Sequence, residues 1–389
     1  MRILHISNKP AFPVIDGGCV AIKSVLKSLI SKKSFNVFHL TLSSYKHPFD
    51  ESAYPSTWKD RMKLDHFFIN TKTDLLGALI HLIKNKSYNV SRFYDKQLVK
   101  QLHQLLEKEL FDTVLLESIY LLPYLDVFRQ YNLKVVVRTH NVEHEIWSEL
   151  SRASKSRIKK SYFNKLSRQL KEYELSVLKK VDGVITISQD DLNYFKEAGI
   201  TVGGIVLPTS IKTDFALPDY QLKDFYFLGA MDWLPNKEGI DWLVKSVLND
   251  QRVSEKVYIA GKGMKKNKIS SPYVESIGEV DNARSFINQH GICLIPLLSG
   301  SGLRIKLLEN MALGKPIVTT SVGAKGVDVV NKKHVLIADT PADFFAAMEE
   351  LSMDISLRKK LGKAAQQFVF DNFDEQKITQ KLVDFIKKI

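Results

Sequence analysis

The sequence predicts an α/β protein with two doubly wound, Rossmann-like domains. Apolar stretches of strand length alternate with helical stretches along most of the chain, which is typical of a parallel sheet covered by helices. The length of 389 residues suggests two to three domains. Residues 291–323 form one complete unit of this pattern: an apolar strand, a Gly-rich turn, a helix that ends at Gly314, and a return strand.

The composition limits the kinds of partner. Lys and Arg number 56 against 43 Asp and Glu, a formal net charge of +13, which favours an acidic partner: nucleic acid, an anionic membrane or a phosphorylated substrate. No nucleic-acid-binding motif is visible. Cys19 and Cys293 lie far apart in apolar contexts, which favours a reduced, cytoplasmic protein. The opening MRILHISNKP turns polar too soon for a signal peptide, and the apolar stretch 75–83 is too short to span a bilayer.

The first half of the chain predicts one doubly wound domain. We expect its strands at residues 1–7, 37–42, 112–116, 134–138 and 183–188, the last being the final strand of this half. Gly17 and Gly18 precede a helix, where unpaired backbone N–H groups can bind an anion, although such a pair is often only a turn. A G-x-G-x-x-G motif is absent, which counts against a nicotinamide enzyme.

His140 follows the strand expected at 134–138 and has three interpretations. It can face a ligand at the carboxyl end of the sheet, or it can be a loop or capping histidine. Together with Glu143 and His144 it also fits H-x-x-E-H, the ligand pattern of a group of zinc peptidases. That pattern needs a continuous helix, whereas this segment begins where a strand ends.

Residues 152–171 combine apolar and basic side chains. Ile158, Tyr162, Leu166 and Leu170 recur every four residues, and basic residues surround them without any acidic one. The segment is either a core helix with a solvated face or a surface for peripheral contact with an anionic membrane.

The second half predicts a second parallel sheet after a connection at residues 203–218. We expect strands at residues 225–229, 256–261, 274–278, 291–297 and 317–320. Ser301 is expected to cap the helix that follows the Gly-rich turn. Lys306 and Glu309 are neighbours on that helix, which suits a nucleotide's phosphates and ribose, or equally an ordinary exposed Lys–Glu pair.

The stretch GSGLRIKLLENMALGKPIVTT, residues 300–320, resembles the C-terminal signature of retaining GT-B glycosyltransferases of family 4 (glycosyl transferases group 1). That signature is a Gly-rich turn followed by L-E-x-M-A-x-G-x-P-[IV]-[IV]-x-[ST]. The resemblance implies an N-terminal acceptor-side domain at 1–205, a nucleotide-sugar donor domain at 206–370, and a helix at 371–389 that packs back on the first. A cleft is expected between the two domains.

The implied activity is that of a hexosyltransferase that moves a sugar from a nucleotide-diphosphate donor, with retention of configuration. The acceptor would be a glycan or a lipid-linked molecule in surface polysaccharide or glycoconjugate synthesis. No cofactor or metal is expected, and the work would be cytoplasmic, at the inner membrane face. A phosphorylase or epimerase of the same fold, a non-catalytic sugar-nucleotide binder and a zinc hydrolase stay open as alternatives.

The resemblance also implies the site residues. They are His140, Arg304 and Lys306 for catalysis, and Gly17, Gly18, Val280, Ser301, Gly302 and Glu309 for donor binding. Two positions depart from the family pattern. Ser301 replaces the first of two glutamates eight positions apart, and Ala230 follows Gly229 where relatives carry an arginine. We expect Arg304 and Lys306 to grip the diphosphate instead, unless Arg304 only caps or pairs locally.

Overall fold

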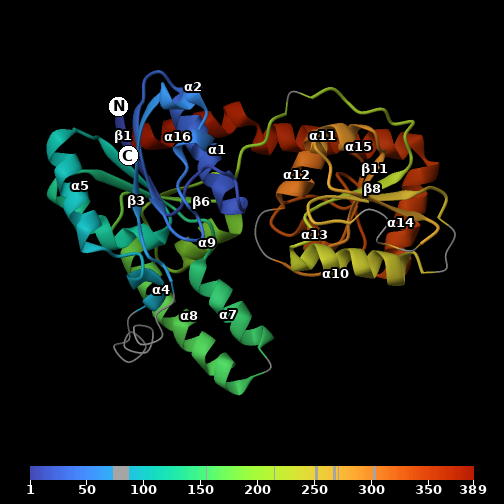
Figure 1. Ribbon diagram of the computed structural model, residues 1–389, viewed down its shortest axis with the longest axis horizontal. Coiled ribbons are helices and arrows are strands. Elements are labelled where there is room, and N and C mark those ends of the chain that lie inside the picture. Colours follow the sequence, from blue (N-terminus) through green and yellow to red (C-terminus); the bar gives the residue numbers. More distant parts are fainter. Residues whose placement is uncertain are drawn as a thin grey trace. The chain divides into compact units, whose positions relative to one another are not determined.

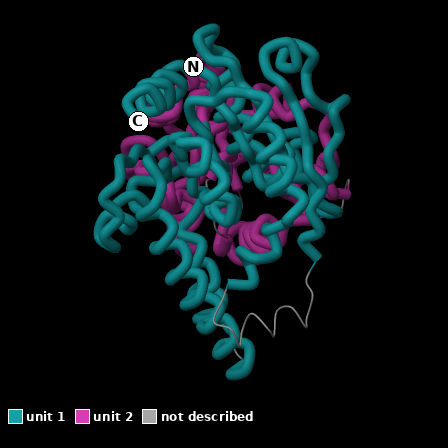
Figure 2. The backbone as a smooth tube through the Cα atoms, turned by 90° about the vertical axis from the view of Figure 1, so that its left-hand side faces the viewer, with its two compact units in different colours: residues 1–209, 376–389 teal, residues 210–375 magenta. Residues whose placement is uncertain are grey.

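A computed structural model describes residues 1–72, 87–154, 156–213, 215–249, 253–265, 269, 271–300 and 304–389 (Figure 1). The apolar stretch 75–83, Ser301 and Gly302 therefore lie outside the described residues. The chain forms two compact units (Figure 2). Unit 1 comprises Met1–Thr209 and Gln376–Ile389, and unit 2 comprises Ser210–Glu375. The domain boundaries expected from the sequence were 205/206 and 370/371.

Unit 1 is built on a seven-stranded parallel sheet of order β3-β2-β1-β4-β5-β6-β7. Its strands are β1 (Arg2–Ser7), β2 (Asn36–Ser43), β3 (Met62–Phe68), β4 (Thr113–Glu117), β5 (Lys134–Arg138), β6 (Gly183–Thr186) and β7 (Gly203–Val206). Its helices are α1 (Gly17–Ser31), α2 (Ser56–Lys59), α4 (Tyr88–Ser91), α5 (Lys96–Lys108), α6 (Leu125–Gln130), α7 (Glu143–Ala153), α8 (Arg157–Leu178), α9 (Gln189–Glu197) and α16 (Glu375–Lys388), with 3₁₀ turns η1 (Glu51–Ala53) and η2 (Ile119–Tyr124).

Two edge strands correct the sequence-based assignment. β3 was not expected, because its alternating polar residues look like a loop. Residues 203–206 were expected to open the connection between domains, but they form β7, which pairs in parallel with β6. The strand at 183–188 is therefore not the last of this half.

Both faces of the first sheet are buried. Along β1, Leu4 and Ile6 belong to one core cluster, whereas Ile3 belongs to the cluster on the opposite face. This is the alternation that a strand covered on both sides requires. The second cluster also contains Leu382 and Ile386 of α16, so the last helix of the chain completes the core of unit 1.

Unit 2 is built on a six-stranded parallel sheet of order β10-β9-β8-β11-β12-β13. Its strands are β8 (Phe225–Leu228), β9 (Val257–Ala260), β10 (Val274–Gly278), β11 (Ile292–Ile295), β12 (Ile317–Thr319) and β13 (Leu336–Ile337). Its helices are α10 (Leu234–Trp242), which continues into a π-helical turn at Leu243–Val247, α11 (Ala283–Asn288), α12 (Ile305–Ala312), α13 (Ser321–Ala324), α14 (Pro341–Met353) and α15 (Ile355–Phe373).

Each sheet reverses its strand order at one place. In unit 1 the chain runs outward from β1 to β2 and β3, and then starts again on the other side of β1 with β4. In unit 2 the same reversal lies between β8 and β11. Ligands of open α/β sheets bind outside the carboxyl ends of the two strands at such a point. The residues that follow β1, β4, β8 and β11 are therefore the first place to look for a site.

Candidate functional site

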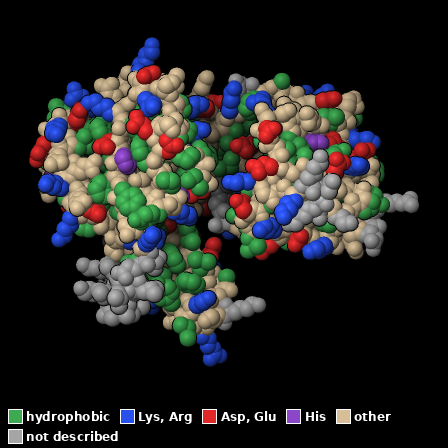
Figure 3. All heavy atoms as spheres, in the orientation of Figure 1, with side chains coloured by type: hydrophobic (Ala, Val, Ile, Leu, Met, Phe, Trp, Pro, Cys, Tyr) green, Lys and Arg blue, Asp and Glu red, His purple; other side chains and the backbone are tan. Residues whose placement is uncertain are grey.

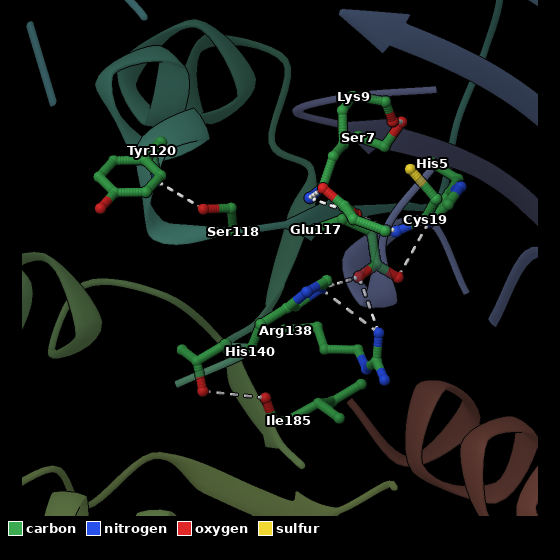
Figure 4. A network of polar contacts seen from close by, with 12 residues as sticks. His5, Ser7, Lys9, Cys19, Glu117, Ser118, Tyr120, Arg138, His140 and Ile185 are labelled. Carbon is green, nitrogen blue, oxygen red and sulfur yellow. Dashed lines mark hydrogen bonds and ion pairs between the residues drawn. The ribbon is translucent and has the colours of Figure 1, made fainter. Parts of the chain in front are cut away.

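Glu117, the last residue of β4, is the centre of a buried polar network at the reversal point of unit 1 (Figure 4). Its Oε2 lies 3.0 Å from Nη1 of Arg138 and 2.7 Å from Nε2 of His140. Its Oε1 lies 3.2 Å from Nε2 of His5. The side chains of Glu117, Arg138 and His5 are fully buried, whereas that of His140 keeps 16% of its surface exposed.

The network keeps Glu117 ionised. Burial alone would raise the pKa of Glu117, but the Arg138 guanidinium, His140 and His5 together hold it well below its usual value. Burial lowers the pKa of His140 below its ordinary value, opposed by Glu117 and assisted by Arg138. A carboxylate and a neutral imidazole therefore lie side by side near neutral pH.

A third histidine, His39 on β2, extends the network. Nδ1 of His5 lies 3.0 Å from Nδ1 of His39, and the two rings stack with centroids 4.8 Å apart. Burial lowers the pKa of His39 well below its ordinary value, and the neighbouring His5 adds to this. His39 is therefore neutral, and the network buries one carboxylate with one guanidinium.

Gly17 and Gly18 are the first two residues of α1, with Asp16 as its N-cap. Both oxygens of Asp16 accept hydrogen bonds from Nζ of Lys9 at 2.9 Å, and Oδ2 also accepts one from Nε2 of His47 at 3.0 Å. A Cβ atom at Gly18 would lie 2.4 Å from the same Nζ, so glycine makes room for the ammonium group. The ion pair of Lys9 and Asp16 therefore lies at the N-terminus of α1, where the sequence predicts an anion site.

The structure does not join the three residues of the possible zinc motif in one site. α7 begins at Glu143, so His140 precedes the helix. His140 contacts Glu117, Glu143 accepts a hydrogen bond from the Tyr120 hydroxyl at 2.8 Å, and both ring nitrogens of His144 are engaged by Glu174 and Tyr194. Among the residues described, the one group with metal-ligand geometry is Asp16, Cys19 and His47, and there Lys9 already balances the carboxylate.

In unit 2 the reversal point gathers a lysine, an amide and a glycine. Nζ of Lys306, on the first turn of α12, lies 3.3 Å from Oδ1 of Asn236 on α10 and 4.1 Å from the centre of the Phe227 ring. A Cβ atom at Gly229, directly after β8, would lie 2.3 Å from this Nζ. Burial lowers the pKa of Lys306 to about 8, partly offset by Cys293 and Glu309. Among the described residues, no carboxylate forms a salt bridge with this ammonium.

Arg304 has a local structural role. Its Nε donates to the Val322 carbonyl at 3.0 Å and its Nη2 donates to the Gly300 carbonyl at 2.8 Å, and the residue is 5% exposed. It also occupies the N-cap position of α12, which was expected for Ser301, so the helix begins later than predicted. These contacts fit the local alternative given for Arg304, and phosphate binding by Arg304 and Lys306 stays a prediction.

The remaining donor-side residues lie at the same edge of the second sheet. Glu309 is exposed one turn beyond Lys306, and its carboxylate forms no hydrogen bond with any described residue. Val280 follows β10 and packs against the core cluster beneath α12. Ser301 and Gly302 are not described, so their part stays a prediction.

Sequence reasoning missed Glu117, Arg138, His5 and Lys9. One signal was available: a charged residue ends the apolar stretch VLLE at Glu117 and again VVVR at Arg138, directly at the carboxyl ends of two buried strands. The pairing of these strands brings the two charges together.

The basic segment 152–171 spans the end of α7 and most of α8, which pack together as a hairpin that projects from unit 1 (Figure 1). Leu166 and Leu170 are buried, but Ile158 is 83% and Tyr162 39% exposed. The core-helix interpretation is therefore wrong for the first part of α8. Basic residues line an open hollow along this helix: Arg157, Lys160, Lys165 and Arg168. Figure 3 shows hydrophobic and basic side chains together on the projection.

The comparison with known protein families gives a match within unit 2. Residues 223–354 match the family described as Glycosyl transferases group 1. The matched residues all lie within unit 2. The match includes β8, Asn236, Lys306 and Glu309, so the reversal point of the second sheet lies within the matched region.

Two relatives extend the comparison. The chain is 24% identical over 400 residues to an uncharacterized 44.6 kDa protein in the cps region of Klebsiella pneumoniae, covering 97% of each chain. It is 27% identical over 198 residues to an uncharacterized glycosyltransferase of Methanocaldococcus jannaschii, covering 48% of this chain and 54% of the relative.

Solved structures show the fold of the whole chain. HepE of Anabaena in complex with UDP is 12% identical, covers 100% of both chains and has a TM-score of 0.65. Sucrose-phosphate synthase of Thermosynechococcus elongatus is 14% identical, covers 100% of this chain and 99% of its own, and has a TM-score of 0.67. The chain thus has the two-sheet GT-B fold expected from the sequence. In the described part of the chain, no helix is long and apolar enough to cross a bilayer.

Proposed function

We propose that the protein is a retaining glycosyltransferase of hexosyltransferase type that uses a nucleotide-diphosphate sugar. The observation that carries the proposal is Lys306. It is an ammonium group with no described carboxylate in salt-bridge contact, held against Gly229 and Asn236 at the reversal point of a unit that matches the glycosyl transferases group 1 family. HepE, a structural neighbour, is known in complex with UDP and with UDP-glucose, which supports a nucleotide-sugar donor.

The chemistry needs a cation where the leaving diphosphate gains charge. As the bond to the anomeric carbon breaks, negative charge grows on the diphosphate oxygens, and a preorganised cation in a desolvated place lowers that barrier. Lys306 supplies it, and its lowered pKa makes the gain on binding an anion larger than for an exposed lysine. Glu309, exposed one turn along α12, is placed to accept hydrogen bonds from ribose hydroxyl groups.

The acceptor we propose is a glycan or lipid-linked molecule of surface polysaccharide synthesis. The relative from a cps region supports this role, and its match extends over nearly the whole chain. Two alternatives share the fold: a phosphorylase or epimerase, and a binder of sugar nucleotides without turnover. The products distinguish them, because they would be a sugar phosphate, an isomerised donor, or none.

The decisive experiment measures binding and then products. Isothermal titration with UDP-, GDP- and ADP-glucose is run on the wild type, Lys306→Met and Glu309→Gln, with Lys245→Met as control because Lys245 is an exposed lysine of the same unit. We expect one nucleotide class to bind, Lys306→Met to weaken its binding at least tenfold, Glu309→Gln to weaken it less, and Lys245→Met to leave it unchanged. Failure of all three donors to bind the wild type contradicts the proposal.

The stereochemistry is tested on the product. With the donor that binds and a panel of hydroxyl-bearing sugars, the coupling constant of the anomeric proton by NMR reports the configuration. We expect the configuration of the donor; the opposite configuration would overturn the retaining assignment.

We also propose that the protein works in the cytoplasm, at the inner membrane face, and contacts an anionic membrane through α8. The exposed Ile158 and Tyr162 lie beside four basic residues of the same helix, and apolar and basic groups together favour an anionic interface. Co-sedimentation with phosphatidylglycerol vesicles at low salt should be strong for the wild type and weak for Ile158→Ser. Equal sedimentation of both proteins, or none with phosphatidylglycerol, contradicts this contact.

A further inference from the structure

The contact between Glu117 and His140 defines which nitrogen of His140 carries a proton. Glu117 is ionised and has no proton to donate, because Arg138 also points a guanidinium N–H at the same oxygen, Oε2. The 2.7 Å distance from Oε2 to Nε2 of His140 is a hydrogen bond only if Nε2 carries the proton. Nε2 also lies 3.4 Å from Nη1 of Arg138, which is another donor, so both groups converge on Oε2.

The other nitrogen of His140 is then left with a lone pair. A neutral imidazole has one protonated nitrogen, and burial keeps His140 neutral near pH 7 with Arg138 and Lys9 as further positive neighbours. Nδ1 makes no hydrogen bond with any described residue, and the side chain retains some exposed surface. The histidine therefore offers an acceptor to a ligand, whereas a histidine protonated at Nδ1 would offer a donor.

The far side of Glu117 makes the arrangement rigid. Oε1 accepts from Nε2 of His5, whose Nδ1 lies 3.0 Å from Nδ1 of His39, and His39 Nδ1 also lies 3.3 Å from the His5 carbonyl. One pattern satisfies these contacts: His39 donates from Nδ1, and His5 accepts at Nδ1 and donates from Nε2. Rotation of the Glu117 carboxylate would break the side-chain hydrogen bonds that link β4 to β1 and to β5.

We propose that Glu117 is a positioning residue that holds the proton of His140 on Nε2, so that Nδ1 accepts a hydrogen bond from a hydroxyl group of the acceptor molecule. The hydroxyl assignment follows from the lone pair on Nδ1. An unprotonated ring nitrogen accepts hydrogen bonds only from donors, and a hydroxyl group donates, whereas ionised phosphate oxygens only accept. This part of the inference rests on the proposed function, whereas the position of the proton does not.

The tautomer is measured directly on the whole protein labelled with ¹⁵N-histidine. Long-range ¹H–¹⁵N correlation distinguishes a protonated from an unprotonated ring nitrogen, and the signals of His140 are those lost in His140→Gln. At pH 7.5 we expect an unprotonated Nδ1 and a protonated Nε2. A proton on Nδ1, or a cationic ring, overturns the proposal.

The role of Glu117 is tested by removing its charge together with that of Arg138. In Glu117→Leu/Arg138→Met no buried charge of the pair is left alone, so folding is retained, and circular dichroism verifies this. We expect the two nitrogens of His140 to give averaged signals, as in a free neutral imidazole. An unchanged, fully Nε2-protonated His140 in this variant shows that Glu117 does not position it.

The ligand contact is tested with two replacements of His140. A Gln side chain can donate to Glu117 but has no acceptor at the place of Nδ1, whereas the oxygen of Asn can lie near that place. UDP affinity should be equal to the wild type in both, since Lys306 and Glu309, which we propose to bind the nucleotide, lie in unit 2. We expect transfer to fall at least tenfold in His140→Gln and less in His140→Asn. Equal transfer by both variants overturns the contact. If the wild type binds no nucleotide sugar, the proposed function fails while the NMR result stands by itself.

Discussion

Arg138 and Glu117 form an ion pair between the ends of two neighbouring parallel strands, with 3.0 Å between Nη1 and Oε2 and no exposed surface on either side chain. The pair lies at the point where the strand order of unit 1 reverses. His140, which the sequence predicts to be catalytic, forms a hydrogen bond with Glu117 of this pair. Two predictions concern its energetics.

Removing one partner should destabilise unit 1 much more than removing both. Glu117→Leu leaves the Arg138 guanidinium buried without its carboxylate, which costs about 3–5 kcal/mol. Replacing both charges with apolar side chains of similar size is often nearly neutral. Urea unfolding of Glu117→Leu, Arg138→Met and the double variant should give two large losses and one small one. Additive losses would show that the two side chains do not interact as the distance indicates.

The free energy of unfolding should fall more steeply with acid in the wild type than in Glu117→Leu/Arg138→Met. The pKa of Glu117 is lower in the folded protein than its usual value near 4.5, so its contribution to stability is complete above pH 4.5 and is lost as the pH falls toward the folded value. The depressed pKa of Asp16 acts in the same direction in both proteins and cancels in the comparison. The free energy of unfolding, measured from pH 6 to pH 3, should therefore fall less in Glu117→Leu/Arg138→Met. Parallel curves would mean that Glu117 titrates normally.

Replacing Lys306 with Met should stabilise the unliganded protein while it weakens donor binding. The pKa of Lys306 falls from 10.5 to about 8 on folding, so the charged form is penalised. At about 1.4 kcal/mol per pKa unit, the penalty is on the order of 3–4 kcal/mol. It is complete below pH 8 and vanishes as the pH rises toward 10.5, where the unfolded chain also loses the proton. Thermal melts of both proteins at pH 7 and pH 10 should show a gap that shrinks at high pH; a constant gap argues against a buried ammonium.

Alanine substitutions at Gly229 and at Gly17 should have different effects on nucleotide-sugar binding and on stability. A methyl group at Gly229 would meet Nζ of Lys306 at 2.3 Å and Nδ2 of Asn236 at 2.9 Å, so Gly229→Ala should displace the lysine and weaken nucleotide-sugar binding at least tenfold. At Gly17 nothing lies within 4 Å, and the position is helical. Gly17→Ala should therefore be neutral or stabilise by up to about 1 kcal/mol. Calorimetric binding and thermal melts of both variants check this, and normal binding by Gly229→Ala would contradict the placement of Lys306.

The sequence was sufficient for the parts of the fold that depend on local pattern. Short apolar stretches such as VLLE and VVVR favour buried strands of a parallel sheet, and the helix after the Gly-rich turn shows its apolar face directly. Lys306 and Glu309 could be placed because three residues of helix bring two side chains to one face. Three edge strands were missed: β3 and β7 because they are mostly half-buried or exposed and lack a long apolar run, and β13 because it has only two residues.

The network around Glu117 could not be predicted in the same way. His5 and Glu117 are 112 residues apart and meet only because β1 and β4 are neighbours, which no local pattern specifies. For Arg304 the local pattern was visible in the sequence, but it did not specify the contacts of the side chain. Its place beside a Gly-rich turn suits a phosphate, but its actual partners are backbone carbonyl groups whose position depends on the tertiary fold.

The helix α16 has a consequence for how the protein is made. Ile378, Leu382 and Ile386 fill the core beneath β1 and α1, although unit 2 lies between them in the chain. On the ribosome, the first 209 residues must therefore wait for the other 180 to be translated before their hydrophobic core is closed. Unit 2 consists of one continuous segment and can fold while that wait lasts. Nascent chains that stop before residue 376 leave the apolar underside of α1 open, where a chaperone would bind.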